Sequence, residues 1–185
     1  MKTGKFIATI LLFFLALIVS AQGKYSTKAG RIIFYSSTSV ENIEAINKSA
    51  VAIVDSKTGD IQFAVLMKGF EFKKALMQED FNRDYVESSK FPKAEFKGQV
   101  TNNSEINYGA DGIYTAKVKG KLTIHGETKD IETAGTISIK DGKVQVKSVF
   151  NIQIADYKII VRKLYRDNIS STIKITVDCS LDPMK

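Results

Sequence analysis

The residue types that most often carry out chemistry are scarce in this chain. It contains one histidine, His125, and one cysteine, Cys179. A hydrolytic triad needs a nucleophile and an acid that converge on an imidazole, and no G-x-S-x-G motif is present to supply the nucleophile. Because His125 stands beside Gly126, we expect a turn on the outer side of the sheet in which the ring has a structural role. The residues predict no catalytic site.

Residue patterns typical of metal ligation or phosphate binding are also absent from the sequence. Asp and Glu residues are dispersed singly, and no group of His and Cys residues has the spacing of metal ligands. The glycines are isolated, so they form no loop that would cradle a phosphate. One cysteine excludes an intrachain disulfide, and the folded state must therefore be stabilised by its core. We expect no metal and no conventional cofactor.

The charge pattern narrows the class of partner. Lysine and arginine together number 27 against 20 acidic residues, which gives a formal net charge of +7. Lysine is far commoner than arginine and is scattered along the chain, which is typical of a solvated surface and argues against nucleic-acid binding. Such a surface is compatible with peripheral contact with anionic membrane lipids.

The first 21 residues resemble a secretory signal. Lys2 and Lys5 precede an apolar run over residues 6–19, and small residues follow at Ser20 and Ala21. We therefore expect residues 1–21 to be a cleaved signal peptide, residues 22–185 to form one domain, and the protein to be periplasmic or secreted. An uncleaved N-terminal anchor is the alternative. The residue directly after the expected cleavage site is Gln22, whereas a lipid-anchored bacterial lipoprotein carries a cysteine at that position.

The elements that must position any site are mainly strands. Apolar and polar residues alternate from Lys93 onward, with lysines at 117, 119 and 121 on the expected outer side. This pattern predicts an all-β, antiparallel fold of about eight strands, either a closed barrel or a sandwich. The expected strands cover residues 31–37, 49–55, 61–67, 93–101, 114–124, 131–139, 144–154 and 173–179.

Two segments depart from the strand pattern. Met77, Phe81 and Tyr85 recur every four residues, which predicts one helix over about residues 73–88. Residues 158–167 are expected to be helical or irregular.

The inward faces of the expected strands also contain small residues, which either leave open volume or serve as bends and bulges. These small residues are Ala94, Gly98, Ala116, Gly120 and Gly135.

Three motifs resemble those of the YceI-like family of secreted bacterial proteins. Residues 120–129, GKLTIHGETK, are similar to the family's G-x-L-T-I-H-G-x-T-K signature. Residues 91–96, FPKAEF, and residues 74–82, KALMQEDFN, resemble two further elements in the same order. The chain departs from the family at residues 153–159, QIADYKI, where many relatives carry N-R-S-D-F-G-I.

The resemblance implies a lipocalin-like antiparallel β-barrel, with the predicted helix packed near an open end and a long isoprenoid or similar lipid inside. Aromatic and methionine side chains at the helix either form ordinary core or line a lipid tunnel, and the resemblance favours the tunnel. The candidate lipid-binding residues are Phe63, Phe70, Phe72, Met77, Phe81, Phe91, Phe96, Val118, Leu122 and Phe150.

The functional expectation is non-enzymatic carriage or sequestration of that lipid in the periplasm, with the lipid as the ligand and no other cofactor. The alternative is a filled barrel that binds a protein or a membrane surface through its rim or its lysine-rich face. An enzyme acting on a bound lipid is a third hypothesis, and no group of reactive residues supports it.

Overall fold

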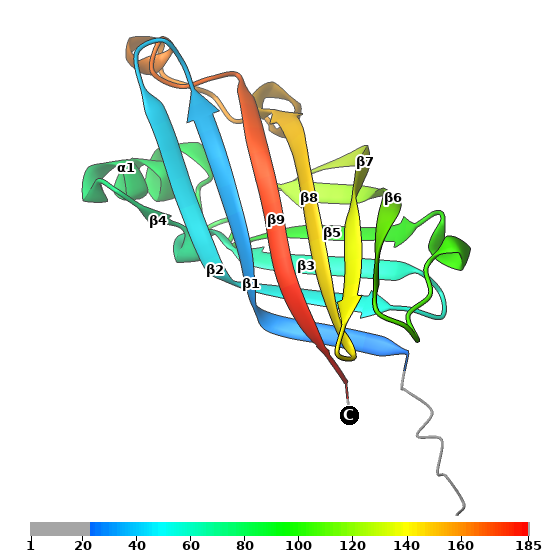
Figure 1. The fold of residues 1–185 in the computed structure, drawn as a ribbon. Helices are drawn as coiled ribbons and strands as arrows, with labels where there is room; N and C mark the ends of the chain where they lie inside the picture. Colours follow the sequence, from blue (N-terminus) through cyan, green and yellow to red (C-terminus); the bar gives the residue numbers. More distant parts are fainter. Residues whose placement is uncertain (1–22, 185) are drawn as a thin grey trace, which may run out of the picture.

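A computed structural model of the protein describes residues 23–184, and the predicted signal peptide lies outside this range. The described chain forms eight long strands and one short strand (Figure 1). The long strands are β1 (Lys24–Ser37), β2 (Asn42–Asp55), β3 (Asp60–Leu66), β5 (Lys93–Val100), β6 (Gly112–Ile124), β7 (Glu127–Lys140), β8 (Lys143–Gln153) and β9 (Thr172–Pro183), and the short strand is β4 (Glu71–Phe72).

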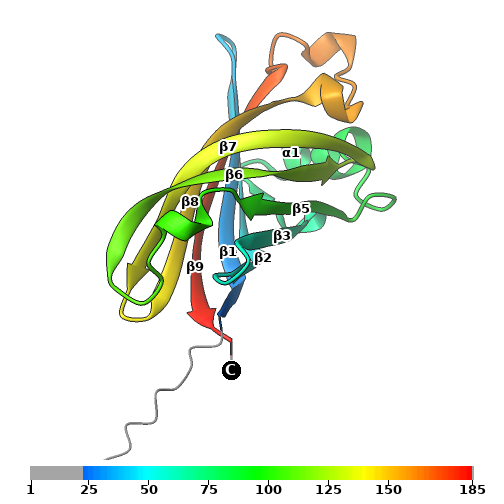
Figure 2. The same ribbon diagram turned by 90° about the vertical axis from the view of Figure 1, so that its right-hand side faces the viewer.

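The eight long strands close into an antiparallel barrel. Their order is β1-β9-β8-β7-β6-β5-β3-β2, and pairing of β1 with β2 completes the ring. The view in Figure 2 shows β5, β6 and β7 curving around the interior. Closure pairs the strands at both sides of the sheet and so removes the exposed edges that an open sheet would present. The prediction of an antiparallel barrel of about eight strands is confirmed.

Strand parity follows the alternation in the sequence. On β5, Phe96 and Val100 are buried, whereas Lys97 and Gln99 are exposed. On the outer face, Lys119 Nζ lies 2.7 Å from a carboxylate oxygen of Glu132 on the neighbouring strand β7. Both partners of this pair are well exposed, so it contributes little to stability.

The inward-facing glycines allow neighbouring strands to approach each other closely, and they do not leave open volume. Gly98 of β5 lies directly opposite Gly120 of β6. A Cβ atom at Gly120 would come within 2.5 Å of Gly98 Cα and 2.6 Å of the Phe96 ring. The aromatic ring therefore covers a site where two backbones nearly touch. The expectation of open volume is therefore wrong at Gly98 and Gly120, whereas Ala94 lines the cavity described below.

The connection between β3 and β5 holds the helix. Helix α1 (Ala75–Asp80) continues into one π-helical turn (Phe81–Tyr85), both inside the predicted range of 73–88. Between β8 and β9 lie two 3-10 turns (Ile154–Tyr157 and Lys163–Tyr165), where the period-two pattern lapses. Figures 1 and 2 place both connections at the same end of the barrel. We call this the open end, for reasons given below.

The opposite end of the barrel is filled by packed side chains. Tyr108, from the connection between β5 and β6, stacks on Tyr25 with 6.1 Å between ring centroids. Its hydroxyl donates a hydrogen bond to Asn103 Oδ1 at 3.0 Å. Burial raises the pKa of the Cys179 thiol to about 11. The side chains that fill this end are fully buried and include Val54, Ile137, Val144, Cys179 and Leu181.

Candidate functional site

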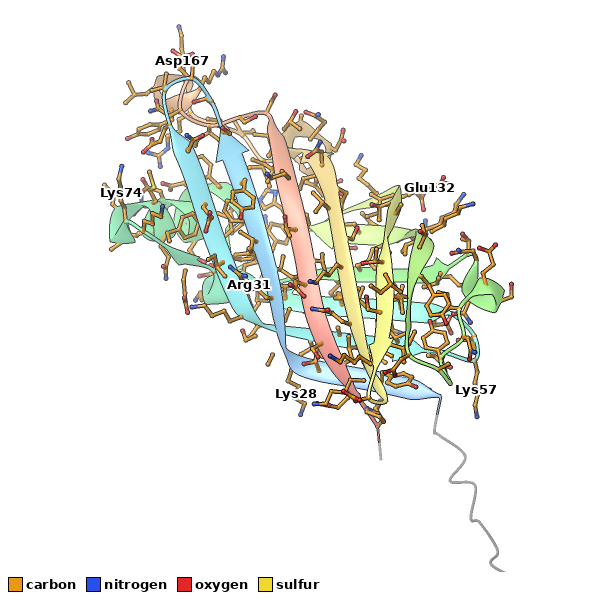
Figure 3. The ribbon with its side chains drawn as sticks, viewed as in Figure 1. Lys28, Arg31, Lys57, Lys74, Glu132 and Asp167 are labelled. Atoms are coloured by element: carbon orange, nitrogen blue, oxygen red, sulfur yellow. The ribbon has the colours of Figure 1, made fainter. Side chains whose placement is uncertain are left out.

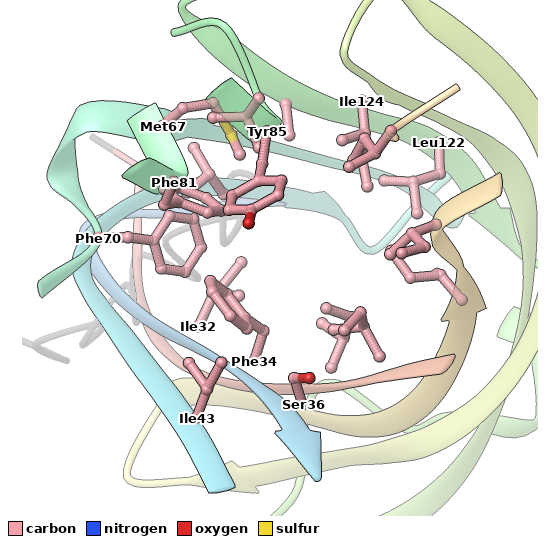
Figure 4. A pocket seen from close by; sticks show the side chains of 18 of the residues that line it. Ile32, Phe34, Ser36, Ile43, Met67, Phe70, Phe81, Tyr85, Leu122 and Ile124 are labelled. Carbon is pink, nitrogen blue, oxygen red and sulfur yellow. The ribbon is translucent and has the colours of Figure 1, made fainter. Parts of the chain in front are cut away.

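A cavity of about 440 Å³ occupies the half of the barrel nearest the open end. This volume lies within the roughly 300–1,000 Å³ typical of small-molecule sites. Figure 4 shows apolar side chains from several elements pointing into one space, among them Ile32 and Phe34 of β1 and Leu122 and Ile124 of β6. All eight long strands, and both connections at the open end, contribute to its lining, and β7 does so through Ile131 and Thr133.

The cavity is a blind tunnel along the strands. On β8 its wall is formed by Val146, Ser148, Phe150 and Ile152. Six residue steps at about 3.3 Å each span about 20 Å along the strand. Beyond Val146 the interior is packed, beginning with Val144, which is fully buried. The tunnel therefore has a floor within the barrel and opens at one end.

Two hydroxyl side chains in the inner wall are already hydrogen-bonded. Ser148 Oγ donates to the backbone carbonyl of Ala134 at 2.8 Å. Thr133 Oγ1 lies 3.3 Å from the same carbonyl and 3.4 Å from Ser148 Oγ. Because these groups have partners within the wall, they do not need a polar ligand. The inner part of the cavity is suited to hydrocarbon.

One side of the mouth is a cluster of phenylalanine rings. The Phe34 ring of β1 lies 5.3 Å from Phe70, 5.6 Å from Phe72 and 5.3 Å from Phe81, measured between centroids. These separations are typical of favourable aromatic pairs. The cluster joins the helical connection to the barrel wall and presents flat carbon surface to the cavity, which all four residues line.

The polar groups of the site lie at the mouth. A carboxylate oxygen of Glu41 accepts a hydrogen bond from Lys74 Nζ at 2.9 Å, and the other accepts one from Asn168 Nδ2 at 3.3 Å. The bond from Lys74 is the main reason that the pKa of Glu41 is lowered. Burial raises the pKa of the Tyr85 hydroxyl. The mouth therefore offers charged and hydroxyl groups above an apolar tunnel.

The two connections at the open end are tied together. Asp84, after α1, forms ion pairs with Arg83 and with Arg162 of the second connection, and these hold the pKa of Asp84 below its usual value.

His125 lies in the turn between β6 and β7 with a positive φ of 53°. Its Nδ1 lies 3.0 Å from the Tyr157 carbonyl oxygen, and its Nε2 lies 2.8 Å from a Glu87 carboxylate oxygen.

The structure corrects one detail of the expectation for His125. Its side chain is only 12% exposed, so it does not project from the outer face with the lysines of β6. It lies beneath residues from both connections and does not line the cavity. The turn position is as expected, but the expectation of local hydrogen bonds is wrong, because both partners of the ring lie on segments that are distant in sequence.

All but one of the predicted lipid-binding residues line the cavity. Phe91 does not, because its ring packs edge-on against His125 at 4.7 Å and would lie 2.5 Å from a Cβ at Gly126. The first residue of the motif at 91–96 thus meets the histidine of the motif at 120–129 away from the cavity. The predicted residues that line it are Phe63, Phe70, Phe72, Met77, Phe81, Phe96, Val118, Leu122 and Phe150.

Sequence reasoning missed several other lining residues. Ile32, Phe34 and Ser36 share one face of β1, so the period-two rule applied to residues 31–37 could have placed them inward together. Tyr85 belonged to the predicted helical stripe but was not assigned to the site. Ile159 and Val161 line the mouth from an irregular segment, for which no periodic signal exists. Met67 lines the cavity from a 3-10 turn (Met67–Gly69).

The closed barrel with an internal apolar cavity defines a lipocalin-like fold. The model of the YceI-like domain matches residues 20–181, and the chain belongs to this family. No curated protein sequence matches this chain.

Solved structures with low sequence identity share the fold. A polyisoprenoid-binding domain from Saccharophagus degradans, implicated in plant cell wall breakdown, aligns with a TM-score of 0.77 at 14% identity, covering 88% of this chain and 99% of that one. BcnA from Burkholderia cenocepacia gives 0.67 at 16% identity, covering 82% and 95%. A YCEI protein from Campylobacter jejuni gives 0.56 at 15% identity, covering 100% and 94%.

Two further observations concern membrane spans and metals. Within residues 23–184, no helix is both long and apolar enough to cross a bilayer. In the same part of the chain, no three His, Cys, Asp or Glu side chains are grouped so that they could hold a metal ion.

Proposed function

We propose that the protein binds a long-chain isoprenoid or a similar amphipathic lipid in the barrel cavity, as a carrier or sequestering protein in the periplasm or outside the cell. The observation that carries this proposal is the blind tunnel of about 440 Å³ with an apolar wall and polar groups only at its mouth or hydrogen-bonded within its wall. A hydrocarbon chain would enter the tunnel, and the polar end of the lipid would remain near Glu41, Lys74 and Tyr85.

Burial of the chain would provide the affinity. Each methylene group withdrawn from water contributes roughly 0.8 kcal/mol. The tunnel holds no charged side chain at the level of Val118 and Val146, so a chain there would meet only carbon and satisfied hydroxyl groups. The name of the Saccharophagus degradans relative supports an isoprenoid ligand, and the predicted signal peptide supports the location outside the cytoplasm.

We propose no catalytic role. The ring nitrogens of His125 are both within hydrogen-bonding distance of protein oxygens. The cavity in the interior favours the carrier over the alternative of a filled barrel.

Native mass spectrometry of the protein purified from its own compartment, followed by lipid extraction, tests the proposal directly. We expect a bound species that releases a long-chain lipid on extraction. A protein that carries no lipid and takes up no added isoprenoid would contradict it.

A matched pair of substitutions tests the location of the ligand. Val118→Trp places a large ring in the tunnel, whereas Val149→Trp places the same ring on the outer wall, where Val149 is exposed. We expect Val118→Trp to reduce uptake of a labelled isoprenoid at least about tenfold while the barrel still folds, because the ring fills volume that the lipid would occupy. Val149→Trp should bind as the wild type does. Equal uptake by both variants would place the ligand elsewhere.

A further inference from the structure

The connection between β8 and β9 carries apolar side chains on two sides. Ile159, Val161 and Tyr165 line the cavity mouth. Ile160 and Leu164, between them in sequence, face solvent and are 78% and 80% exposed. A soluble surface seldom presents large aliphatic side chains this openly beside a ligand entrance, and grouped examples mark interaction sites.

Basic side chains accompany these exposed residues. Lys163 and Arg166 are exposed and form no ion pair with any residue between 23 and 184. Lys158 and Arg162 are paired with Glu127 and with Asp84 on other elements. The acidic residues of the same connection are Asp156 and Asp167, so its basic residues outnumber its acidic ones.

Neighbouring segments extend this surface around the mouth. Val40, in the turn between β1 and β2, and Leu76 of α1 are also exposed apolar residues. Glu41 joins the three segments, because it contacts Lys74 before α1 and Asn168 after the second 3-10 turn. Figure 3 shows Lys74 and Asp167 at this end of the molecule and Lys28 and Lys57 at the other. We call Val40, Leu76, Ile160, Lys163, Leu164 and Arg166 the mouth rim.

We propose that the mouth rim docks on the surface of an anionic lipid bilayer. Exposed aliphatic side chains next to unpaired cations match the chemistry of such a surface, where the apolar groups enter the headgroup boundary and the cations contact phosphates. This orientation places the cavity mouth against the bilayer, so a lipid would move between the two with little exposure to water. The inference goes beyond the proposed function, since the rim side chains that its test changes do not line the cavity, namely Ile160, Lys163, Leu164 and Arg166.

Co-sedimentation with vesicles tests the docking. The purified protein should bind vesicles of mixed phosphatidylglycerol and phosphatidylcholine more tightly than vesicles of phosphatidylcholine alone, and salt at ~0.5 M should weaken the binding. Ile160→Ser with Leu164→Ser should weaken binding at least about tenfold through loss of apolar contact. Lys163→Glu with Arg166→Glu should weaken it by a similar factor through loss of attraction to the anionic surface.

The opposite end of the barrel offers matched controls. Ile113 is 78% exposed, as Ile160 is, but lies at the start of β6 away from the mouth. Ile113→Ser, and Lys28→Glu with Lys57→Glu, should leave vesicle binding unchanged. The proposal is overturned if the wild type does not bind the anionic vesicles, or if the controls weaken binding as much as the rim variants do. A variant such as Val118→Trp should still dock, which separates this test from that of the cavity.

Discussion

His125 shows how a single side chain at the open end links segments that are far apart in sequence. The turn that contains it is short, with positive φ at both His125 and Gly126, which is the geometry of a tight hairpin. Its ring then contacts the Tyr157 carbonyl on one connection and the Glu87 carboxylate on the other. The histidine of the family signature therefore holds the covering segments on the barrel, and nothing in its position requires contact with a ligand.

Replacing His125 by alanine should lower the free energy of unfolding by about 1–3 kcal/mol, because the buried Tyr157 carbonyl loses its partner. Lipid binding should stay within a few fold of the wild type. Denaturant unfolding and binding of a labelled isoprenoid measure the two effects. His125→Asn tolerates positive φ and keeps a hydrogen-bonding group, so it should lose less stability. Complete loss of binding by a folded His125→Ala variant would instead make the ring a functional group.

Among the elements, β5 and β6 approach each other closely at one pair of glycines in the barrel wall. Gly98 and Gly120 form this pair, and the Phe96 ring covers both. This arrangement explains why the family signature begins with glycine at position 120. The same contact makes the site a poor place to block the cavity, since a larger side chain would meet backbone before it reached open volume.

Gly120→Ala should therefore destabilise the fold by about 2 kcal/mol or more, because the new methyl group would lie 2.5 Å from Gly98 Cα and from the Lys97 carbonyl oxygen. Gly109→Ala is the matched control, since its Cβ would meet no atom closer than 3.4 Å. It should change stability by no more than about 0.5 kcal/mol. Thermal or denaturant unfolding distinguishes the two. Equal effects would mean that β5 and β6 are not so closely apposed.

The whole molecule divides into a packed end, where Tyr108 is partly buried, and an open end, where Tyr157 is buried. Burial raises the pKa of Tyr108, at the packed end, to about 12, and it does the same for Tyr157, beneath the open-end connections. The folded state thus favours the neutral phenol at both ends. An unfolded chain releases these protons near pH 10.

The free energy of unfolding should therefore hold up to pH ~10 and then fall until pH ~12, because the unfolded state binds fewer protons over that range. Denaturant titrations at several alkaline pH values measure this loss, and tyrosinate absorbance follows ionisation in the native state. A variant with Tyr108→Phe and Tyr157→Phe should lose less stability over the same range. Tyr85, whose pKa is also raised, should account for part of the remainder. An unchanged slope in this variant would reject the assignment.

The sequence by itself determined the strand pattern, which predicted an antiparallel barrel or sandwich, and the family motifs favoured the barrel. Alternation is a local property, because successive side chains on a strand point to opposite faces. It was enough to assign Phe96, Val118 and Leu122 to the interior and the β6 lysines to the outside. The four-residue spacing of Met77, Phe81 and Tyr85 likewise located the helix. These features need no knowledge of which strands become neighbours.

Only the tertiary structure decided which inward residues face open space. Val118 and Ala116 have the same parity on β6, yet Val118 lines the cavity and Ala116 is packed. The difference depends on barrel curvature and on the loop that fills one end, and both arise from contacts between distant segments. Phe91 was misplaced for the same reason: its neighbour is His125, on a strand hairpin more than 30 residues away. A periodic pattern specifies a direction for each side chain, whereas the free volume in that direction is a property of the closed barrel.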